Sequence, residues 1–309
     1  MKVESMLQRA LSSVVLAFVC ACASVAPAGK LPQAPLAPRE VRLFRGDGTA
    51  ANWSELVEAA CAAEAVFVGE NHGHPLGLAS AAALFEDVLA RSERASLSLE
   101  FFERDEQSRL DDYLSGVSDA ATLERRTQRS EGNYPPGHRA MVELAKSKGR
   151  PVHASNAPRQ YVRIVSQKGY EPLQQLSWEQ RRLFRIPDEL LTGRYRDDFD
   201  RIMTPNGRDP QAADEQTRLA RVFRSQQMWD WTMAESVFLA LERDEAPVVQ
   251  VIGRFHSDFR GGTVQALERL RPSTRALVVS YVNEDAPAAL PADDVGRGDF
   301  VLYVGPSAD

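Results

Sequence analysis

The stretch "VFVGENHGHP", residues 66–75, ends an apolar run on a glycine, a glutamate and two histidines. A second stretch, "VVQVIGRFHSDF" at residues 248–259, also passes from apolar residues through a glycine to a histidine. Both contain Gly-x-x-His after a β-branched run, which predicts a buried strand that ends in a sharp corner. Glycine suits such a corner because it tolerates positive φ and close backbone approach.

Further short β-branched runs occur along the chain. The predicted strands are residues 65–69, 95–102, 150–155, 246–253, 275–282 and 300–305. Helical patterns at residues 77–92, 105–116 and 137–149 separate the first of them. This alternation predicts an α/β fold with a largely parallel β-sheet flanked by helices. Between the third and fourth strands, a helical insertion or lid is expected over about residues 157–245, and its clearest helix begins near Pro210.

The N-terminus has the pattern of a targeting segment. In residues 1–22, Lys2 and Arg9 precede an apolar stretch that is too short to span a bilayer. This stretch ends in Val-Cys-Ala-Cys, which resembles a bacterial lipoprotein signal with Cys22 as the lipidated residue; simple signal cleavage is the alternative. Lipidation would anchor the protein to a membrane, and the periplasmic side of the outer membrane is the expected place in the cell envelope.

The remaining chain divides into a tether and one domain. Residues 23–40 are rich in proline and alanine and are expected to form an extended tether, with a single domain over residues 41–309. Of the 309 residues, 43% are hydrophobic and 26% charged, which is enough for a sizeable core. The net charge of -6 argues against nucleic acid as a partner, because no basic surplus can neutralise phosphates.

Polar residues gather where the predicted strands end. In an open parallel sheet, ligands bind at the carboxyl ends of the strands. Four strand ends deliver Glu70, His72, Glu100, Asn156 and His256. Each alone has a structural explanation, but together they predict one polar site. Two carboxylates in one site require a protonated histidine, a metal or a shared proton beside them.

Histidine and glutamate together suit two kinds of chemistry. One is a divalent metal held by His72, Glu100 and His256, and the other is acid–base catalysis. Other polar residues are weaker candidates. His138 and His153 are expected to be structural, whereas Gln227 and Asp230 could point together into the cleft from one helix.

Five blocks in order resemble the ChaN-like haem-binding uptake lipoproteins. They are "VGENH", "SLEFFERDEQSRLDDYLSG", "NYPPGHRAMVELAKSKGRPVHASNAPR", "QQMWDWTMAESV" and "VIGRFHSDFRGG". These lipoproteins belong to a superfamily with the Tiki, TraB and erythromycin-esterase-like proteins. The resemblance implies an α/β sheet with a helical insertion, and a polar site at Glu70, His72, Glu100, Asn156 and His256.

The functions implied by the resemblance differ among its branches. ChaN-like members imply haem binding, with two haems shared across a homodimer and a tyrosine on the iron, for which Tyr134 and Tyr195 are the candidates. Tiki-like members imply metal-dependent peptide hydrolysis. Erythromycin-esterase-like members imply hydrolysis through histidine and carboxylates without a serine nucleophile. The Gly-x-x-His corners occur in all of these branches and do not choose among them.

Two main functions are therefore expected. The first is an envelope lipoprotein that binds haem or iron for uptake or storage; the alternative is a hydrolase, with or without metal, that uses the Glu/His cluster. A third hypothesis is an envelope scaffold that keeps the two corners only for stability. Haem needs an apolar slot, an axial ligand and cations for its propionates. The helical insertion offers Phe184, Phe199, Phe223 and many arginines for such a slot.

Overall fold

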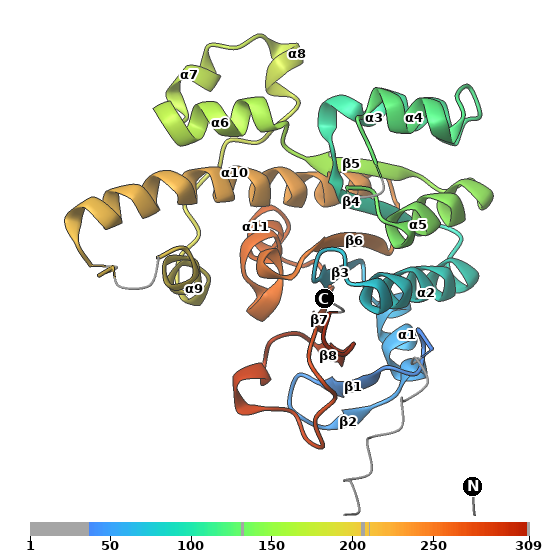
Figure 1. The fold of residues 1–309 in the computed structure, drawn as a ribbon. Helices are drawn as coiled ribbons and strands as arrows, with labels where there is room; N and C mark the ends of the chain where they lie inside the picture. Colours follow the sequence, from blue (N-terminus) through green and yellow to red (C-terminus); the bar gives the residue numbers. More distant parts are fainter. Residues whose placement is uncertain (1–36, 131–132, 205–207, 210, 308–309) are drawn as a thin grey trace, which may run out of the picture. The chain divides into compact units, whose positions relative to one another are not determined.

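The structure, a computed structural model, describes residues 37–130, 133–204, 208–209 and 211–307. These residues form a sheet with strand order β2-β1-β8-β7-β3-β6-β4-β5 (Figure 1). The strands are β1 (Arg42–Arg45), β2 (Ala50–Ala51), β3 (Ala65–Glu70), β4 (Ser96–Glu103), β5 (Val152–Asn156), β6 (Val248–Gly253), β7 (Ala276–Val282) and β8 (Phe300–Tyr303). From β8 to β5 every neighbouring pair is parallel, whereas β1 is antiparallel to β8 and β2. The predicted α/β class and its six strands are confirmed.

Helices fill the connections between the strands. They are α1 (Trp53–Ala62), α2 (Pro75–Arg91), α3 (Gln107–Leu114), α4 (Ala120–Arg126), α5 (Pro136–Ser147), α6 (Arg159–Lys168), α7 (Glu171–Gln174), α8 (Trp178–Arg181), α9 (Arg194–Met203), α10 (Ala213–Glu242) and α11 (Gly262–Leu270). Short 3₁₀ turns η1 (Arg104–Glu106), η2 (Arg254–His256), η3 (Asp258–Arg260) and η4 (Ala292–Asp294) follow or precede strands.

The sheet is covered on both faces, as its continuous apolar strands require. Val66 and Val68 of β3 point to one face and pack with residues of α1, α2 and α5. Ala65 and Phe67 point to the other face and pack with residues of α10 and α11. Because side chains alternate along a strand, one short sequence supplies both cores.

In the described residues between β5 and β6, the regular elements are the helices α6 to α10. The longest of them is α10. It packs against β4, β5 and β6 and forms a structural layer of the domain, and Figure 1 shows it running beside β4 and β5. Its place on the sheet explains how residues in its middle can reach the strand ends.

The predicted signal peptide, with Cys22, and most of the predicted tether lie outside the described residues. The last residues of the tether are described, and Arg39 pairs with Glu86 at 2.7 Å and Asp87 at 2.9 Å on α2. The folded domain therefore begins before residue 41. Within the described ranges, no helix has both the length and the apolar character needed to cross a membrane.

Candidate functional site

The two Gly-x-x-His corners lie next to each other. β3 pairs with β6 in parallel, so that Glu70 stands opposite Gly253. β4 pairs with the other side of β6, which places Glu100 on the next strand end. The strands that carry Glu70 and Glu100 are therefore separated by β6, and its glycine corner lies between the two carboxylates.

Both corner glycines are needed for space. A Cβ at Gly69 would lie 2.6 Å from Oγ of Ser257 and 3.1 Å from Cα of Arg254. A Cβ at Gly253 would lie 2.8 Å from Nε2 of His72 and 3.5 Å from Oε2 of Glu100. Neither glycine has a positive φ. Close approach therefore explains both residues, and Gly253 leaves the room that the His72 ring occupies.

Glu70 is the centre of the first group. It is 2% exposed. Its Oε1 lies 3.0 Å from Nδ1 of His72, and its Oε2 lies 2.8 Å from Nε2 of His138. Burial opposes ionisation of Glu70, but the two histidine contacts outweigh it and hold the pKa of this carboxyl below its usual value. Two histidines thus offset the cost of burying one carboxylate.

These contacts define how the two rings are presented. If each histidine donates an N–H to Glu70, Nε2 of His72 and Nδ1 of His138 keep their lone pairs. The Nδ1 atom of His138 is buried and has no hydrogen-bond partner among the described residues. The His72 side chain is 56% exposed, and its contact with Glu70 raises its pKa. His72 therefore offers an accessible imidazole held by a buried carboxylate.

His256 is the centre of the second group. Its Nδ1 lies 2.7 Å from Oδ1 of Asp230, which also accepts a hydrogen bond from the Thr263 hydroxyl at 3.0 Å. The other oxygen of Asp230 accepts a hydrogen bond from the Tyr195 hydroxyl at 2.5 Å. The side-chain amide of Gln226 contacts both Tyr195 and His256. This network fixes the orientation of the buried His256 ring.

Glu100 lies between the two groups. Its Oε2 accepts a hydrogen bond from the amide of Gly253 at 2.6 Å, and its Oε1 lies 3.8 Å from Nε2 of His256. Burial opposes protonation of His256, but Asp230 and Glu100 outweigh it and raise its pKa to about 9. His256 is therefore a cation at neutral pH, placed between two carboxylates.

Histidines supply positive charge beside the carboxylates of this arrangement. The described residues include no group of three or more His, Cys, Asp or Glu side chains arranged to hold a metal ion. The predicted metal shell of His72, Glu100 and His256 is thus not supported by the geometry.

Asn156 takes a place apart from the cluster. It ends β5, the strand at the sheet edge, and stands opposite Glu103. Its Oδ1 accepts a hydrogen bond from the next amide, that of Ala157, at 2.9 Å. Glu103 in turn accepts from the amide of Arg159 at 3.1 Å, at the start of α6. These contacts describe a strand-to-helix turn, and they do not join Asn156 to the histidines.

The two tyrosines predicted for haem iron are buried. Tyr134 is 2% exposed and packs edge-on against Phe102. Tyr195 is 6% exposed, and its hydroxyl is bonded to Asp230. Burial raises the pKa of both phenols, most strongly for Tyr195. A tyrosine that binds iron must lose its proton, so neither residue is prepared for that role in this structure.

Other predictions for the helical insertion also change. Phe184 is buried in one hydrophobic cluster, and Phe199 and Phe223 are buried in another. Gln227 turns away from the site, because its Oε1 accepts a hydrogen bond from the Leu191 amide at 2.7 Å. Gln226, one residue earlier, is the glutamine that reaches His256. With Asp230 it forms an i, i+4 pair on α10, which shares one helix face.

The remaining histidines have different roles. His138 was expected to be structural, yet it contacts the central Glu70. The sequence feature that could have indicated this contact is Pro135-Pro136, which begins α5 and places His138 on its first turn. His74 caps α2, with Nδ1 accepting from the Gly77 amide at 3.1 Å. His153 pairs with Glu245 at 2.5 Å, ahead of β6, and is structural as predicted.

Cavities lie beside the cluster. A groove of about 920 Å³ between α2 and α5 reaches Gly73 and Gly137, the sequence neighbours of His72 and His138. A cleft of about 700 Å³ reaches Arg254 and Phe255, on the turn that carries His256. Each of these cavities therefore touches a segment that also supplies a histidine of the cluster.

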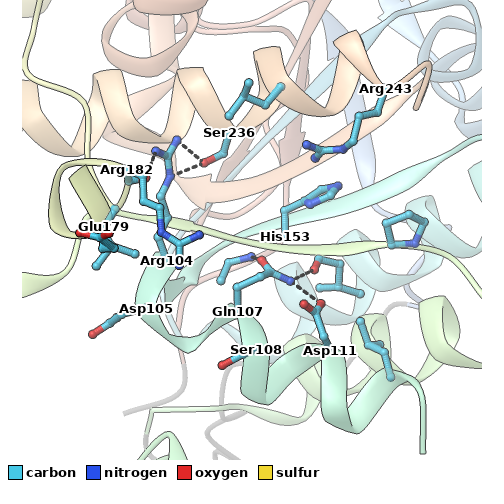
Figure 2. A pocket seen from close by; sticks show the side chains of 16 residues that line it. Arg104, Asp105, Gln107, Ser108, Asp111, His153, Glu179, Arg182, Ser236 and Arg243 are labelled. Carbon is cyan, nitrogen blue, oxygen red and sulfur yellow. Dashed lines mark hydrogen bonds between the residues drawn. The ribbon is translucent and has the colours of Figure 1, made fainter.

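A third cavity, of about 770 Å³, lies at the sheet edge near β5 (Figure 2). Figure 2 shows Arg104 beside Ser236, and Gln107 below His153. The guanidinium of Arg104 donates to Ser236, Glu235 and the Thr232 carbonyl. Gln107 bridges β5, with its amide donating to Val152 O at 2.9 Å and its carbonyl accepting from Ala154 N at 2.7 Å. The central polar groups of this cavity therefore already have partners.

Comparison with known proteins decides the family. A family model described as "Haem-binding uptake, Tiki superfamily, ChaN" matches residues 56–267, more than half of the chain. The chain belongs to this family. The matched region runs from α1 to α11 and includes both histidine corners. No curated protein matches the chain in sequence.

Solved structures agree with the fold of this ChaN family member. ChaN of Campylobacter jejuni, described with cofacial haem binding, superposes with a TM-score of 0.64 at 15% identity, covering 85% of this chain and 96% of that one. A succinoglycan biosynthesis protein superposes with a TM-score of 0.50 at 10% identity, covering 88% and 95%. An erythromycin esterase variant gives a TM-score of 0.42 at 14% identity, covering 82% and 78%. At these identities the first two superpositions show the fold alone.

Proposed function

We propose that this protein binds haem and that His72 is the residue that contacts its iron. The observation that carries the proposal is the exposure and hydrogen bonding of the His72 ring. Its side chain is 56% exposed, Nδ1 is held by Glu70 at 3.0 Å, and Nε2 has no hydrogen-bond partner among the described residues. An accessible imidazole with one nitrogen fixed is the form in which histidine binds iron in haem proteins.

The residues behind His72 support this role. Histidines that bind metals usually donate their other ring N–H to a carboxylate, which fixes the ring and raises its basicity. Glu70 occupies that position, and His138 holds the far oxygen of Glu70 at 2.8 Å. The Phe101 ring packs edge-on against His72, with centroids 5.3 Å apart. The ring is thus fixed from two sides before any ligand arrives.

The groove between α2 and α5 suits the apolar part of haem. Its volume of about 920 Å³ lies within the range typical of small-molecule sites. Most of its lining is apolar, with Leu78, Ala82 and Leu144 among the side chains. Arg39 lies at its border and is paired there with Glu86 and Asp87. The groove is lined by Gly73, the residue next to His72 in the sequence, but not by His72 itself.

Haemin titration tests this proposal. The purified protein should bind haemin with a defined stoichiometry and a shifted Soret band, because a fixed ligand and slot give one kind of complex. An unrelated protein of similar net charge serves as the control. A weak response that does not saturate, and that matches the control, would remove haem from the account.

We also propose that the protein acts at the cell envelope as a lipoprotein in haem or iron uptake. The support is the sequence of residues 1–22, which resembles a lipoprotein signal with Cys22 as the lipidated residue. Cys22→Ser should abolish labelling by a radioactive fatty acid, whereas Cys20→Ser should not. Labelling that persists in Cys22→Ser but is lost in Cys20→Ser would contradict the choice of cysteine.

A hydrolase is the second candidate, and one observation favours it. His256 is oriented by Asp230 at 2.7 Å, and Glu100 lies 3.8 Å from its other nitrogen. A cationic histidine beside a free imidazole at His72 provides an acid and a base for ester or peptide cleavage. Hydrolysis of an ester substrate that is lost in both His72→Ala and His256→Ala would favour this function. Absence of turnover in a panel of esters and peptides would count against it.

A further inference from the structure

The cleft beside η2 and η3 contains an unusual collection of arginines. Its volume is about 700 Å³, and α9, the turns after β6 and the segment near Arg297 form its walls. Four arginines and three aspartates line it, although the whole chain has a net charge of -6. The arginines are Arg194, Arg201, Arg254 and Arg297.

Arg254 has only a distant ion-pair partner among the described residues, Asp258. Its side chain is 32% exposed, and its guanidinium donates no hydrogen bond to another described residue. The Nη1 atom is buried without a partner, and the nearest carboxylate oxygen, Oδ2 of Asp258, lies 3.8 Å away, too far for a hydrogen bond. A partly buried guanidinium that makes no hydrogen bonds is costly, and such groups commonly mark a place where a ligand binds.

Two of the three aspartates are already engaged. Oδ2 of Asp258 lies 2.6 Å from the guanidinium of Arg297 and accepts its hydrogen bond. Asp198 lies 3.3 Å from Arg194 and 2.8 Å from Arg201. One carboxylate is thus shared between two exposed arginines, and the other is committed to Arg297. The protein supplies no carboxylate at hydrogen-bonding distance from Arg254, so an anion from solution can take that place.

The opposite wall of the cleft is aromatic. Phe255 packs against Tyr195, with ring centroids 5.1 Å apart, and Phe259 lies under the guanidinium of Arg194 at 3.3 Å. Phe259 has a φ of 56°, a left-handed conformation that is strained for an aromatic residue. Backbone strain of this kind occurs preferentially at ligand-binding segments. Here it holds the aromatic ring at the border of the arginine cluster.

We propose that this cleft binds a small organic anion, with a carboxylate or phosphate on Arg254 and an apolar part against Phe255. The guanidinium of Arg254 supplies a planar pair of donors for an oxyanion. The exposed Arg201 adds long-range attraction. The site is separate from the proposed iron ligand His72 and does not depend on haem binding.

Calorimetric titration tests the inference. The full-length protein in low-salt buffer without phosphate is titrated with phenyl phosphate, phenylacetate and inorganic phosphate. At least one of the two organic anions should bind saturably and more tightly than inorganic phosphate, and the two distinguish a phosphate from a carboxylate ligand. Arg254→Gln should weaken that binding by at least about tenfold, the loss expected for a charge-assisted contact.

Matched variants make the result decisive. Arg163→Gln removes the same charge from an exposed position on α6 outside the cleft and should leave binding unchanged, as should His72→Ala. Arg201→Gln, at a side chain 72% exposed, should weaken binding without disturbing the fold. Absence of saturable binding by both organic anions, or equal loss in Arg163→Gln, would overturn the proposal.

Discussion

At the scale of single residues, the site consists of carboxylates that are each held by a histidine. Glu70 has His72 and His138, and Asp230 has His256. Buried carboxylates without such partners would cost several kcal/mol. The pairing makes stability and function depend on the protonation of these histidines.

The first residue-scale prediction concerns His256. Its pKa is about 9 in the folded protein against an ordinary 6.5. A raised pKa adds stability that is complete below about pH 6.5 and is lost as the pH rises through about 9. The stability difference between the wild type and His256→Gln should therefore shrink by roughly 1 to 3 kcal/mol across this range. Urea denaturation at several pH values measures it, and a difference that stays constant with pH would refute the shifted pKa.

The second residue-scale prediction concerns Gly253. An alanine Cβ would lie 2.8 Å from Nε2 of His72, so the ring must move. Gly253→Ala should cost only about 1 kcal/mol of stability, because a partly exposed side chain can shift, but it should weaken haem binding at least about tenfold. The matched control is Gly77→Ala on α2, where a Cβ meets its nearest neighbour at 3.6 Å. Unchanged haem binding in Gly253→Ala would show that the position of the His72 ring does not control haem binding.

At the scale of elements, β5 is a sheet edge whose free backbone groups are covered by a side chain. Gln107 bonds to Val152 O and Ala154 N, as a neighbouring strand would. Uncovered strand edges tend to pair with other chains. Gln107→Ala should lower the free energy of unfolding by about 1 kcal/mol and increase self-association at high concentration. Chemical denaturation and light scattering measure the two effects.

A control for this element is available in the same cavity. Ser108 lines it beside Gln107. Ser108→Ala should therefore leave stability and association close to those of the wild type. If Gln107→Ala behaves like Ser108→Ala in both measurements, the amide does not protect the edge.

Much of the element pattern could be predicted from the sequence, for identifiable reasons. Strands such as 246–253 are continuous β-branched runs, since a parallel sheet buries both of their faces. The short β1, Arg42–Arg45, was missed because it has only two apolar residues, which stand between two arginines. The adjacency of the two histidine corners followed from the general position of ligands at strand ends.

At the scale of the whole molecule, the partners of the corner histidines could not be predicted. Asp230 was predicted to point into the cleft, but its contact with His256 and that of Gln226 arise only because α10 packs along the sheet. His138 reaches Glu70 because α5 packs against α2. Such contacts depend on how layers meet, which no local pattern contains. The same holds for Tyr195, whose burial against Asp230 separates it from the iron-ligand role.

Haem binding by the whole protein should depend on the pH of the solution, because His72 exchanges a proton with it. The pKa of His72 is raised by Glu70, and only the neutral ring can bind iron. Haem affinity should therefore rise as the pH increases through this raised pKa. Glu70→Gln should move the midpoint to lower pH, as read from Soret titrations at fixed haemin. A midpoint that does not move would mean that Glu70 does not control the iron ligand.

The most direct test of the account is a haemin titration of the His72→Ala variant, followed by the position and intensity of the Soret band. His153→Gln is the matched control, because His153 pairs with Glu245 ahead of β6, away from the cluster. The account predicts that His72→Ala loses the ligand-specific Soret shift and binds haemin at least about tenfold more weakly, while His153→Gln behaves like the wild type. A wild-type Soret band and affinity in His72→Ala would contradict the central claim that His72 contacts the haem iron.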